Sequence, residues 1–244
     1  LLGDELVIIT GVPFDDVGGG QRAAQLARCA LKTGRNVVYV YIYKKFDFET
    51  NCHVESNINI QGLTHLHIEN TSPTRLLQCI SSRATVIFEF PHPAAINYLR
   101  LFNARGIRTV FELIDDWETS LGGDWFNIGI YRQFVAEAQH VVGTAKLLAD
   151  RLKNLNRSDA LYLPNAANEY IFDKYKNYSK PSDLPIGRRV GLYFGSLYGE
   201  WFAWDYLQEA AIRNADINFV LIGDRPNGKI MPANVHMIGA KMID

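Results

Sequence analysis

Cysteine is scarce in this sequence, and its scarcity excludes two kinds of architecture. The three cysteines, Cys29, Cys52 and Cys79, are widely scattered and form no CxxC pair. The sequence therefore indicates neither a zinc knuckle nor a disulfide framework, and a reducing cytoplasm is the expected location.

A surplus of positive charge is also missing. Lysine and arginine together number 25 against 26 acidic residues, so the formal net charge is −1. A dedicated nucleic-acid binder needs a basic excess that displaces counterions from phosphates. We therefore expect no nucleic-acid partner, although a local basic pocket is compatible with this balance.

Long hydrophobic runs are lacking too, since the longest spans only residues 37–43, far too few to cross a bilayer. We expect no signal peptide before the first strand. Because the chain begins with Leu1 rather than methionine, we expect it to be part of a longer protein. The sequence does contain material for a large core, because 48% of its residues are hydrophobic and 21% are charged, as in globular proteins.

Short β-rich runs alternate with amphipathic helical stretches, which predicts an α/β fold with a parallel sheet covered by helices on both faces. The run LVIIT at residues 6–10 is continuously apolar, as expected for a strand buried on both faces. Further strands are expected at residues 36–43, 64–68, 85–90, 108–114, 140–142 and 160–163. Helices are expected near residues 23–31, 73–80, 128–138 and 147–155, and after Pro93.

The composition changes after this first series. Residues 165–189 are dominated by Asn, Lys, Tyr, Ser and Pro, which predicts a linker between an N-terminal domain of residues 1–164 and a second domain. The second series has expected strands at residues 190–195, 217–223 and 235–238, with one helix through Leu207 and Ala211. A parallel domain needs more strands than these to bury its faces. We therefore expect residues 190–244 to be the start of a C-terminal domain that is incomplete in this chain.

The segment after the first strand is rich in glycine. Gly18, Gly19 and Gly20 precede Arg22 at the carboxyl end of that strand, the edge at which open α/β sheets bind ligands. Glycines let the backbone approach a diphosphate, and free N–H groups at a helix start supply partial positive charge. A tight turn is the alternative, but three consecutive glycines exceed its needs. The spacing is not GxGxxG, and no acidic residue clearly ends the second strand, so a dinucleotide site is disfavoured.

Asp115, Asp116 and Trp117 follow the strand expected at residues 108–114. Carboxylates at such a strand end can accept hydrogen bonds from sugar hydroxyls or act as a base. An Asp-Asp pair is usually a solvated loop start or a helix cap, but the Trp and Asp residues of the loop 117–125 suit a carbohydrate, which stacks its apolar faces on rings. We assign Asp115 and Asp116 as catalytic candidates and Trp117 as a substrate-binding candidate.

His92 stands between two prolines after the strand expected at residues 85–90 and is a second substrate-binding candidate. A structural turn in which Pro93 starts a helix is the preferred interpretation of this segment. Glu89 is interpreted as a strand residue rather than a catalyst. The other histidines show no ligand-like spacing with acidic residues, so we predict no metal site.

The second domain offers two further turns. Gly195 and Ser196 follow its first strand and can hold a phosphate, and Arg225, after the next strand, can pair with a phosphate oxygen. All three are candidates for donor binding. A solvated loop is the preferred interpretation for Arg225, and Trp201 and Trp204 are interpreted as core residues.

Taken in their order and spacing, these segments resemble retaining glycosyltransferases of the GT-B fold, glycosyltransferase family four. The resemblance covers nearly the whole chain and is carried by VPFDDVGGGQRAAQLARCALKTGRNVVYV, FELIDDW, HVVGTAKLLADRL running into YLPNAAN, and VGLYFGSL with FVLIGD. It implies a GT-B-like fold of two Rossmann-like parallel-sheet domains, with Gly19, Gly20 and Arg22 facing the donor diphosphate. Pro164 and Asn165 match the junction into the donor domain.

Three departures from the family pattern stand out. Ser196 and Phe202 occupy the places where many members carry an Arg and a Lys that clamp the diphosphate, so the clamp is absent or rebuilt. Asp115 stands where many members carry histidine. The family's Glu-x7-Glu motif, which holds the donor, would lie beyond residue 244.

The resemblance implies transfer of a hexose from a nucleotide diphosphate sugar to a glycan or lipid-linked acceptor, with retention and without a metal or other cofactor. Asp115 and Asp116 would order the acceptor or the transferred sugar. A lipid-linked acceptor would bring the protein to the inner face of the membrane, although the sequence has no amphipathic basic helix that proves it. Two alternatives remain open, namely a non-catalytic nucleotide-sugar or glycan-binding module of the same fold and a sugar-nucleotide 2-epimerase.

Overall fold

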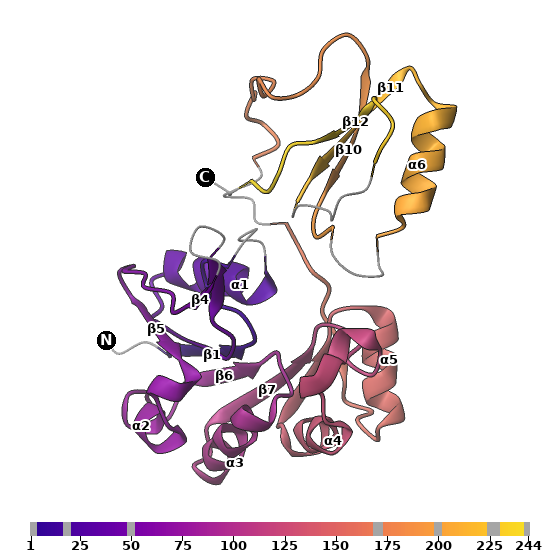
Figure 1. Ribbon diagram of the computed structural model, residues 1–244. Helices are drawn as coiled ribbons and strands as arrows, with labels where there is room; N and C mark the ends of the chain where they lie inside the picture. Colours follow the sequence, from indigo (N-terminus) through magenta and orange to yellow (C-terminus); the bar gives the residue numbers. More distant parts are fainter. Residues whose placement is uncertain are drawn as a thin grey trace. The chain divides into compact units, whose positions relative to one another are not determined.

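The computed structural model describes residues 4–16, 21–47, 52–167, 173–197, 202–223 and 230–241. They form two compact units, with residues 4–16 and 21–167 in the first and residues 173–241 in the second (Figure 1). Each unit has its own parallel sheet, with several helices in the first unit and one described helix in the second.

The first unit is built on a parallel sheet of seven strands in the order β5-β2-β1-β6-β7-β8-β9. Every residue of β1 is buried, as its unbroken apolar sequence predicts for a strand covered on both faces. The strands are β1 (Leu6–Thr10), β2 (Val37–Tyr41), β5 (Leu63–His67), β6 (Thr85–Phe88), β7 (Arg108–Leu113), β8 (His140–Gly143) and β9 (Leu161–Tyr162).

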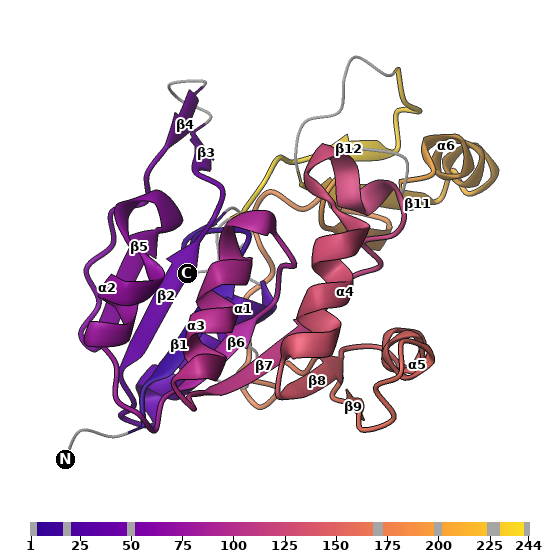
Figure 2. The same cartoon turned by 90° about the horizontal axis from the view of Figure 1, so that it is seen from below.

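Helices cover both faces of this sheet. The alanine-rich face of α1 (Arg22–Lys32) packs on Leu6 and Ile8 of β1, while Val7 and Ile9 of the same strand face the opposite core. The opposite face carries α2 (Pro73–Gln78), α3 (Ile96–Ala104) and α4 (Ile128–Glu137), which follow one another along the sheet (Figures 1 and 2). The last helix, α5 (Lys146–Asn154), packs against β8.

Close helix packing at β8 depends on a glycine. A Cβ atom on Gly143 would lie 2.3 Å from the backbone nitrogen of Ala149 and 2.6 Å from its Cα atom. Since any side chain at this position would meet the backbone of α5, only glycine permits the observed approach.

Several short elements depart from the sequence expectation. Residues 44–61, for which the sequence pattern predicts no strand, contain an antiparallel pair of β3 (Lys45–Asp47) and β4 (Cys52–Val54). The polar loop after Asp115 contains the 3₁₀ segment η3 (Ser120–Trp125), and two further 3₁₀ turns are η1 (Ile68–Asn70) and η2 (Pro93–Ala95). These pieces are too short for hydrophobic periodicity to reveal them.

The second unit contains three parallel strands in the order β10-β11-β12. They are β10 (Arg189–Phe194), β11 (Ile217–Ile222) and β12 (Val235–Met237), with α6 (Trp204–Arg213) between the first two strands in the chain. Val220, Leu221 and Ala211 are its buried apolar residues on β11 and α6. The expected strands and helix of this series are all present, and residues 173–188 contain neither helix nor strand.

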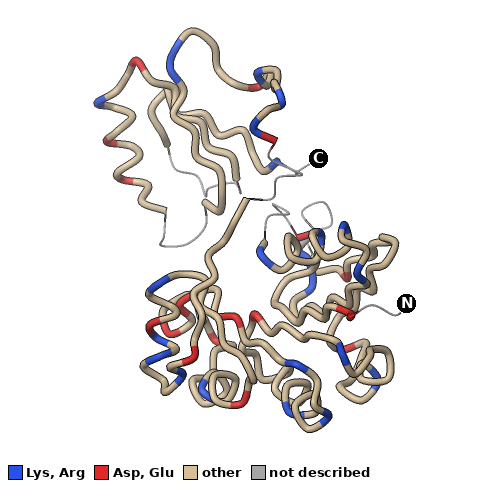
Figure 3. The backbone as a smooth tube through the Cα atoms, turned by 180° about the vertical axis from the view of Figure 1, so that it is seen from behind, with Lys and Arg blue, Asp and Glu red and all other residues tan. Residues whose placement is uncertain are grey.

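Charged residues of both signs are interspersed along the described backbone of both units (Figure 3). Within the residues that the structure describes, no helix combines the length and the apolar character needed to span a membrane.

Candidate active site

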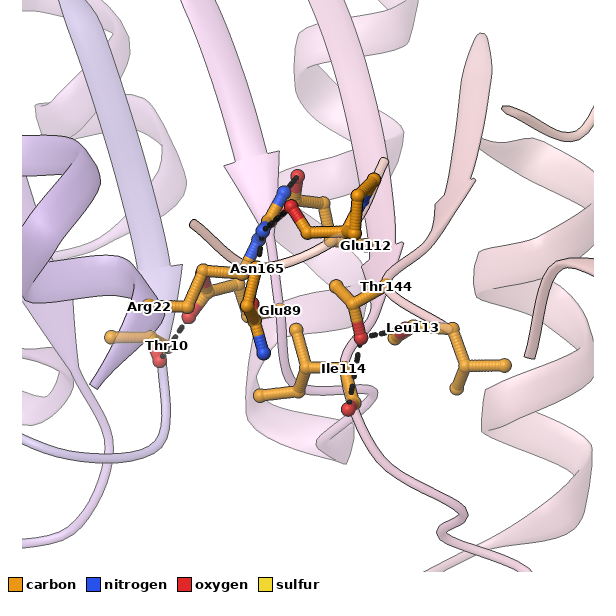
Figure 4. A network of polar contacts seen from close by, with 9 residues as sticks. Thr10, Arg22, Glu89, Glu112, Leu113, Ile114, Thr144 and Asn165 are labelled. Carbon is orange, nitrogen blue, oxygen red and sulfur yellow. Dashed lines mark hydrogen bonds and ion pairs between the residues drawn. The ribbon is translucent and has the colours of Figure 1, made fainter. Parts of the chain in front are cut away.

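The strand order places a topological switch point at the centre of the first sheet. From β1 the chain moves outward through β2 and β5, whereas from β6 it moves the other way through β7, β8 and β9. In open α/β sheets, ligands bind outside the carboxyl ends of the strands at such a point. Polar residues gather there on β1, β6 and β7 and at the start of α1 (Figure 4).

Glu89 lies directly after β6 and is only 1% exposed. Thr10, at the end of β1, donates a hydrogen bond of 3.0 Å from Oγ1 to Glu89 Oε2, while Oε1 is buried without a hydrogen-bond partner among the described residues (Figure 4). Burial, with the negative charge of Glu112 adding to it, raises the pKa of Glu89 to about 8. The carboxyl group is therefore mainly protonated at neutral pH.

The interpretation of Glu89 as a strand residue overlooked this buried acid at the switch point. A signal was available, because a lone carboxylate between Phe88 and Phe90 interrupts an otherwise apolar run. Such a group is buried only with a partner or with a shifted pKa.

Arg22, the first residue of α1, forms a bidentate ion pair with Glu112 of β7. The Nε–Oε2 distance is 2.9 Å and the Nη2–Oε1 distance is 3.0 Å, and the Glu112 side chain is only 4% exposed. The hydrogen bonds that the guanidinium donates to Glu112 raise its pKa further above the usual value. The third nitrogen, Nη1, donates to Asn165 Oδ1 at 3.0 Å and to the Pro164 carbonyl at 3.2 Å.

These contacts give Arg22 internal partners for all three guanidinium nitrogens, so it ties the start of α1 to the segment of Pro164 and Asn165 (Figure 4). Contact of Arg22 with a diphosphate stays a prediction. The predicted glycines of that site, Gly18–Gly20, lie outside the described residues.

Asp115 and Asp116 lie at the carboxyl edge of the sheet, just beyond β7. Thr144 secures this strand end, since its Oγ1 donates to the carbonyls of Ile114 at 3.1 Å and Leu113 at 3.4 Å (Figure 4). The Asp115 side chain is exposed, yet partial desolvation by the surrounding protein raises its pKa.

Asp116 differs from its neighbour because it has a cationic partner. Its Oδ2 lies 2.7 Å from Arg151 Nη2 of α5, while Oδ1 is buried without a partner in the described part of the chain. Asp115 is thus the carboxylate of the pair that is offered to solvent, and Asp116 joins the loop to α5.

Trp117 is 7% exposed and packs its ring against Phe90, with centroids 4.9 Å apart, and against Trp125 at 5.3 Å. The predicted stacking of a sugar on Trp117 would require these neighbours to move. Trp125 is half-buried and is the more accessible indole of the pair.

His92 caps the turn that follows β6. Its Nδ1 accepts a hydrogen bond of 3.1 Å from the Ala94 backbone N–H, and Pro93 begins η2, which confirms the preferred interpretation of this segment. Desolvation lowers the pKa of His92, so the ring is neutral at pH 7. With Nδ1 accepting, its proton resides on Nε2.

In the second unit the turn after β10 is packed closely against the end of β11. Gly195 has φ +146°, and a Cβ atom on Gly223 would lie 2.0 Å from the Gly195 carbonyl oxygen. The Tyr193 hydroxyl donates to the Ser196 carbonyl at 2.9 Å. Phe202, at the expected place of a clamping lysine, packs on Tyr193, with ring centroids 4.8 Å apart. Arg225 lies outside the described residues.

No cluster of three or more potential metal-ligating side chains (His, Cys, Asp or Glu) occurs in the ranges that the structure describes. The switch point instead combines a neutral buried carboxyl group, a neutralised Arg–Glu pair and an exposed carboxylate.

No protein-family model matches the sequence, and no curated protein matches it either. Solved structures do resemble it. HepE of Anabaena, in complex with UDP and glucose, has a TM-score of 0.63 and 12% identity over 98% of this chain and 70% of its own. An alpha-glucosyltransferase in complex with UDP and a 13-mer DNA has a TM-score of 0.61 and 13% identity over 99% of this chain and 68% of its own.

A proposed UDP-N-acetylglucosamine 2-epimerase from Listeria monocytogenes has a TM-score of 0.55 and 9% identity over 98% of this chain and 70% of its own. The present chain spans 57% of another solved alpha-glucosyltransferase chain that it resembles. At such identities these likenesses establish the fold, and they confirm the prediction of a GT-B-like α/β fold with two Rossmann-like units.

Proposed function

We propose that this chain belongs to a glycosyltransferase that moves a hexose from a nucleotide diphosphate sugar to a glycan or lipid-linked acceptor, with retention of anomeric configuration. The observation that carries the proposal is the likeness of nearly the whole chain, across both units, to solved structures that contain UDP, one of them an alpha-glucosyltransferase. The switch point of this chain supplies polar residues of the kind that such a reaction needs.

Within this proposal, Asp115 is the carboxylate that orders the acceptor or the transferred sugar, because it is exposed at the carboxyl edge of the sheet. Gly18–Gly20, Gly195 and Ser196 keep their proposed role in binding the donor. Backbone amides and basic side chains, Arg225 among them, neutralise the leaving group in place of a metal or cofactor. Glu89, being neutral, adds no negative charge near that leaving group.

Release of UDP from UDP-glucose and other UDP-hexoses, with and without added oligosaccharides, tests the proposal. Asp115→Asn should reduce turnover by about 100-fold or more, as for other removed catalytic carboxylates. Asp150→Asn, which changes a 64% exposed carboxylate of α5, is the matched control and should leave turnover near that of the wild type. Turnover by Asp115→Asn equal to the control would remove Asp115 from the site.

The epimerase alternative is favoured by one observation, the likeness to the Listeria protein. Incubation with UDP-N-acetylglucosamine in the absence of acceptor separates the two reactions, because only an epimerase would convert the sugar at C2. A non-catalytic module would show neither product, and calorimetry would then detect binding to glycans without binding to nucleotide sugars.

A further inference from the structure

Four aromatic rings meet where β2 and β6 end. Tyr43 follows β2, Phe90 and His92 follow β6, and Trp125 ends η3. The rings of Phe90 and Trp125 stack with centroids 4.1 Å apart at 27°, and His92 lies 6.0 Å from Trp125 at 33°. Tyr43 stands nearly perpendicular, at 85° to Phe90 and 84° to His92, with both centroids 5.8 Å away. We call this group the aromatic corner.

The aromatic corner adjoins the switch point. The Tyr43 backbone N–H donates to the Gly11 carbonyl at 2.8 Å, and a Cβ atom on Gly11 would lie 3.2 Å from the Phe90 ring. Gly11 directly follows β1 and begins the segment that leads to the glycine-rich stretch. The rings therefore lie beside Gly11, the first residue after the central strand β1.

The aromatic corner is open to a ligand. Tyr43 is 39% exposed, and Phe90, His92 and Trp125 are each half-buried. Trp117 and Phe126 pack against Trp125 from the protein side, so the corner has a rigid base. Large rings exposed next to a ligand edge offer flat apolar surface of the kind that stacks on a planar or pyranose face.

Nucleobases and sugars both stack on such rings, and the charge around the corner distinguishes between a nucleic acid and a neutral sugar. The two lysines that follow Tyr43 are paired with carboxylates, Lys44 with Glu55 and Lys45 with Asp15. His92 is neutral, Glu89 is mainly protonated, Asp115 is an exposed carboxylate, and the cation of Arg151 is paired with Asp116. A nucleic acid would bring phosphates toward these carboxylates without a basic surplus to bind them. A neutral sugar meets no such repulsion, and its hydroxyls can bind the Nε2–H of His92 and the Asp115 carboxylate.

We infer that the aromatic corner is an acceptor subsite, at which Tyr43 and Trp125 stack on a pyranose ring of a neutral glycan. The inference rests on the proposed transferase function for its role in catalysis. It adds Tyr43 and Trp125 to the site and replaces Trp117, whose ring is buried, as the stacking indole.

Tyr43→Ala is the test, because this ring is the most exposed of the four and its loss leaves the other three packed. The KM for an oligosaccharide acceptor should rise about 10-fold. Tyr43→Phe keeps the ring and should retain most of the affinity. Tyr178→Ala removes a 62% exposed tyrosine from the other unit and is the matched control.

Direct binding separates this inference from the proposed function. Calorimetry with maltotriose, cellotriose, mannotriose and a single-stranded thymidine oligonucleotide needs no turnover. Binding of a saccharide that is weakened by Tyr43→Ala and not by Tyr178→Ala supports the subsite even if no donor is consumed. Binding of the oligonucleotide in place of a saccharide, equal saccharide binding by both variants, or no saccharide binding by the wild type overturns it.

Discussion

Replacing Glu89 by glutamine should favour the folded protein increasingly, relative to the wild type, as pH rises. The carboxyl group of Glu89 has a pKa of about 8 in the folded protein against an ordinary value of 4.5. A folded-state pKa that is raised in this way contributes stability that is fully present below pH 4.5 and is lost as pH rises through about 8. Glutamine never ionises, so the variant does not lose this stability as pH rises.

The magnitude follows from the two pKa values. At pH 7 the unfolded side chain is ionised and the folded one is neutral, so the native state is penalised over about 2.5 pH units at about 1.4 kcal/mol each. We compare the free energy of unfolding of the variant minus that of the wild type at two pH values. This difference should be about 3 kcal/mol more favourable to the variant at pH 7 than below pH 4.5. Thr10 can still donate to the amide oxygen. The amide nitrogen, like Oε1 now, has no described partner, and its cost does not change with pH.

Urea denaturation followed by tryptophan fluorescence measures this difference, because buried Trp117 lies in the same unit as Glu89. The free energy of unfolding of the variant minus that of the wild type should rise between about pH 5 and about pH 8 and then level off. Thr10→Val removes the hydrogen bond that lowers the pKa of Glu89, so the same curve measured in that background should level off at higher pH. Glu69→Gln, at a 74% exposed side chain, is the control. A difference that does not vary with pH would refute a buried, neutral Glu89.

Two further predictions concern packing and charge in the first unit. Gly143→Ala should destabilise it by about 3 kcal/mol, because the new Cβ meets the backbone of α5. Gly191→Ala, whose Cβ would make only ordinary contacts, is the comparison in urea denaturation. Equal losses of stability in the two variants would contradict the steric argument. Arg22→Met should cost about 3 to 5 kcal/mol by leaving the Glu112 carboxylate buried and unpaired. Adding Glu112→Leu should recover most of that loss in a double-mutant cycle, and strictly additive losses would show that the two side chains do not interact.

Much of the fold follows from local pattern. Parallel strands that are buried on both faces are continuous apolar runs, which is why β1, β2 and β11 were located to within a few residues. Helices such as α1 show their apolar face at helical spacing. The β3–β4 pair and η3 were missed because three to six residues are too few to establish a period.

Part of the candidate site was also visible in the chain itself. Asp115 could be placed at the ligand edge because it directly follows an apolar strand, and the structure puts it there with an exposed side chain. Its neighbours were harder to assign. A ring or carboxylate is exposed or buried according to what packs on it. The sequence therefore predicted an accessible Trp117, whereas Trp117 is buried and Trp125 is the more accessible ring.

The sequence alone thus established the α/β class, the succession of strands and helices and the residues that end each strand, since these depend on neighbours within a few positions. Packing established the rest. Arg22 reaches Glu112 across 90 positions and Thr10 reaches Glu89 across 79, because strand order brings their elements together. The pKa of Glu89 is likewise a property of the folded chain, since desolvation arises only when other elements exclude water from a carboxyl group.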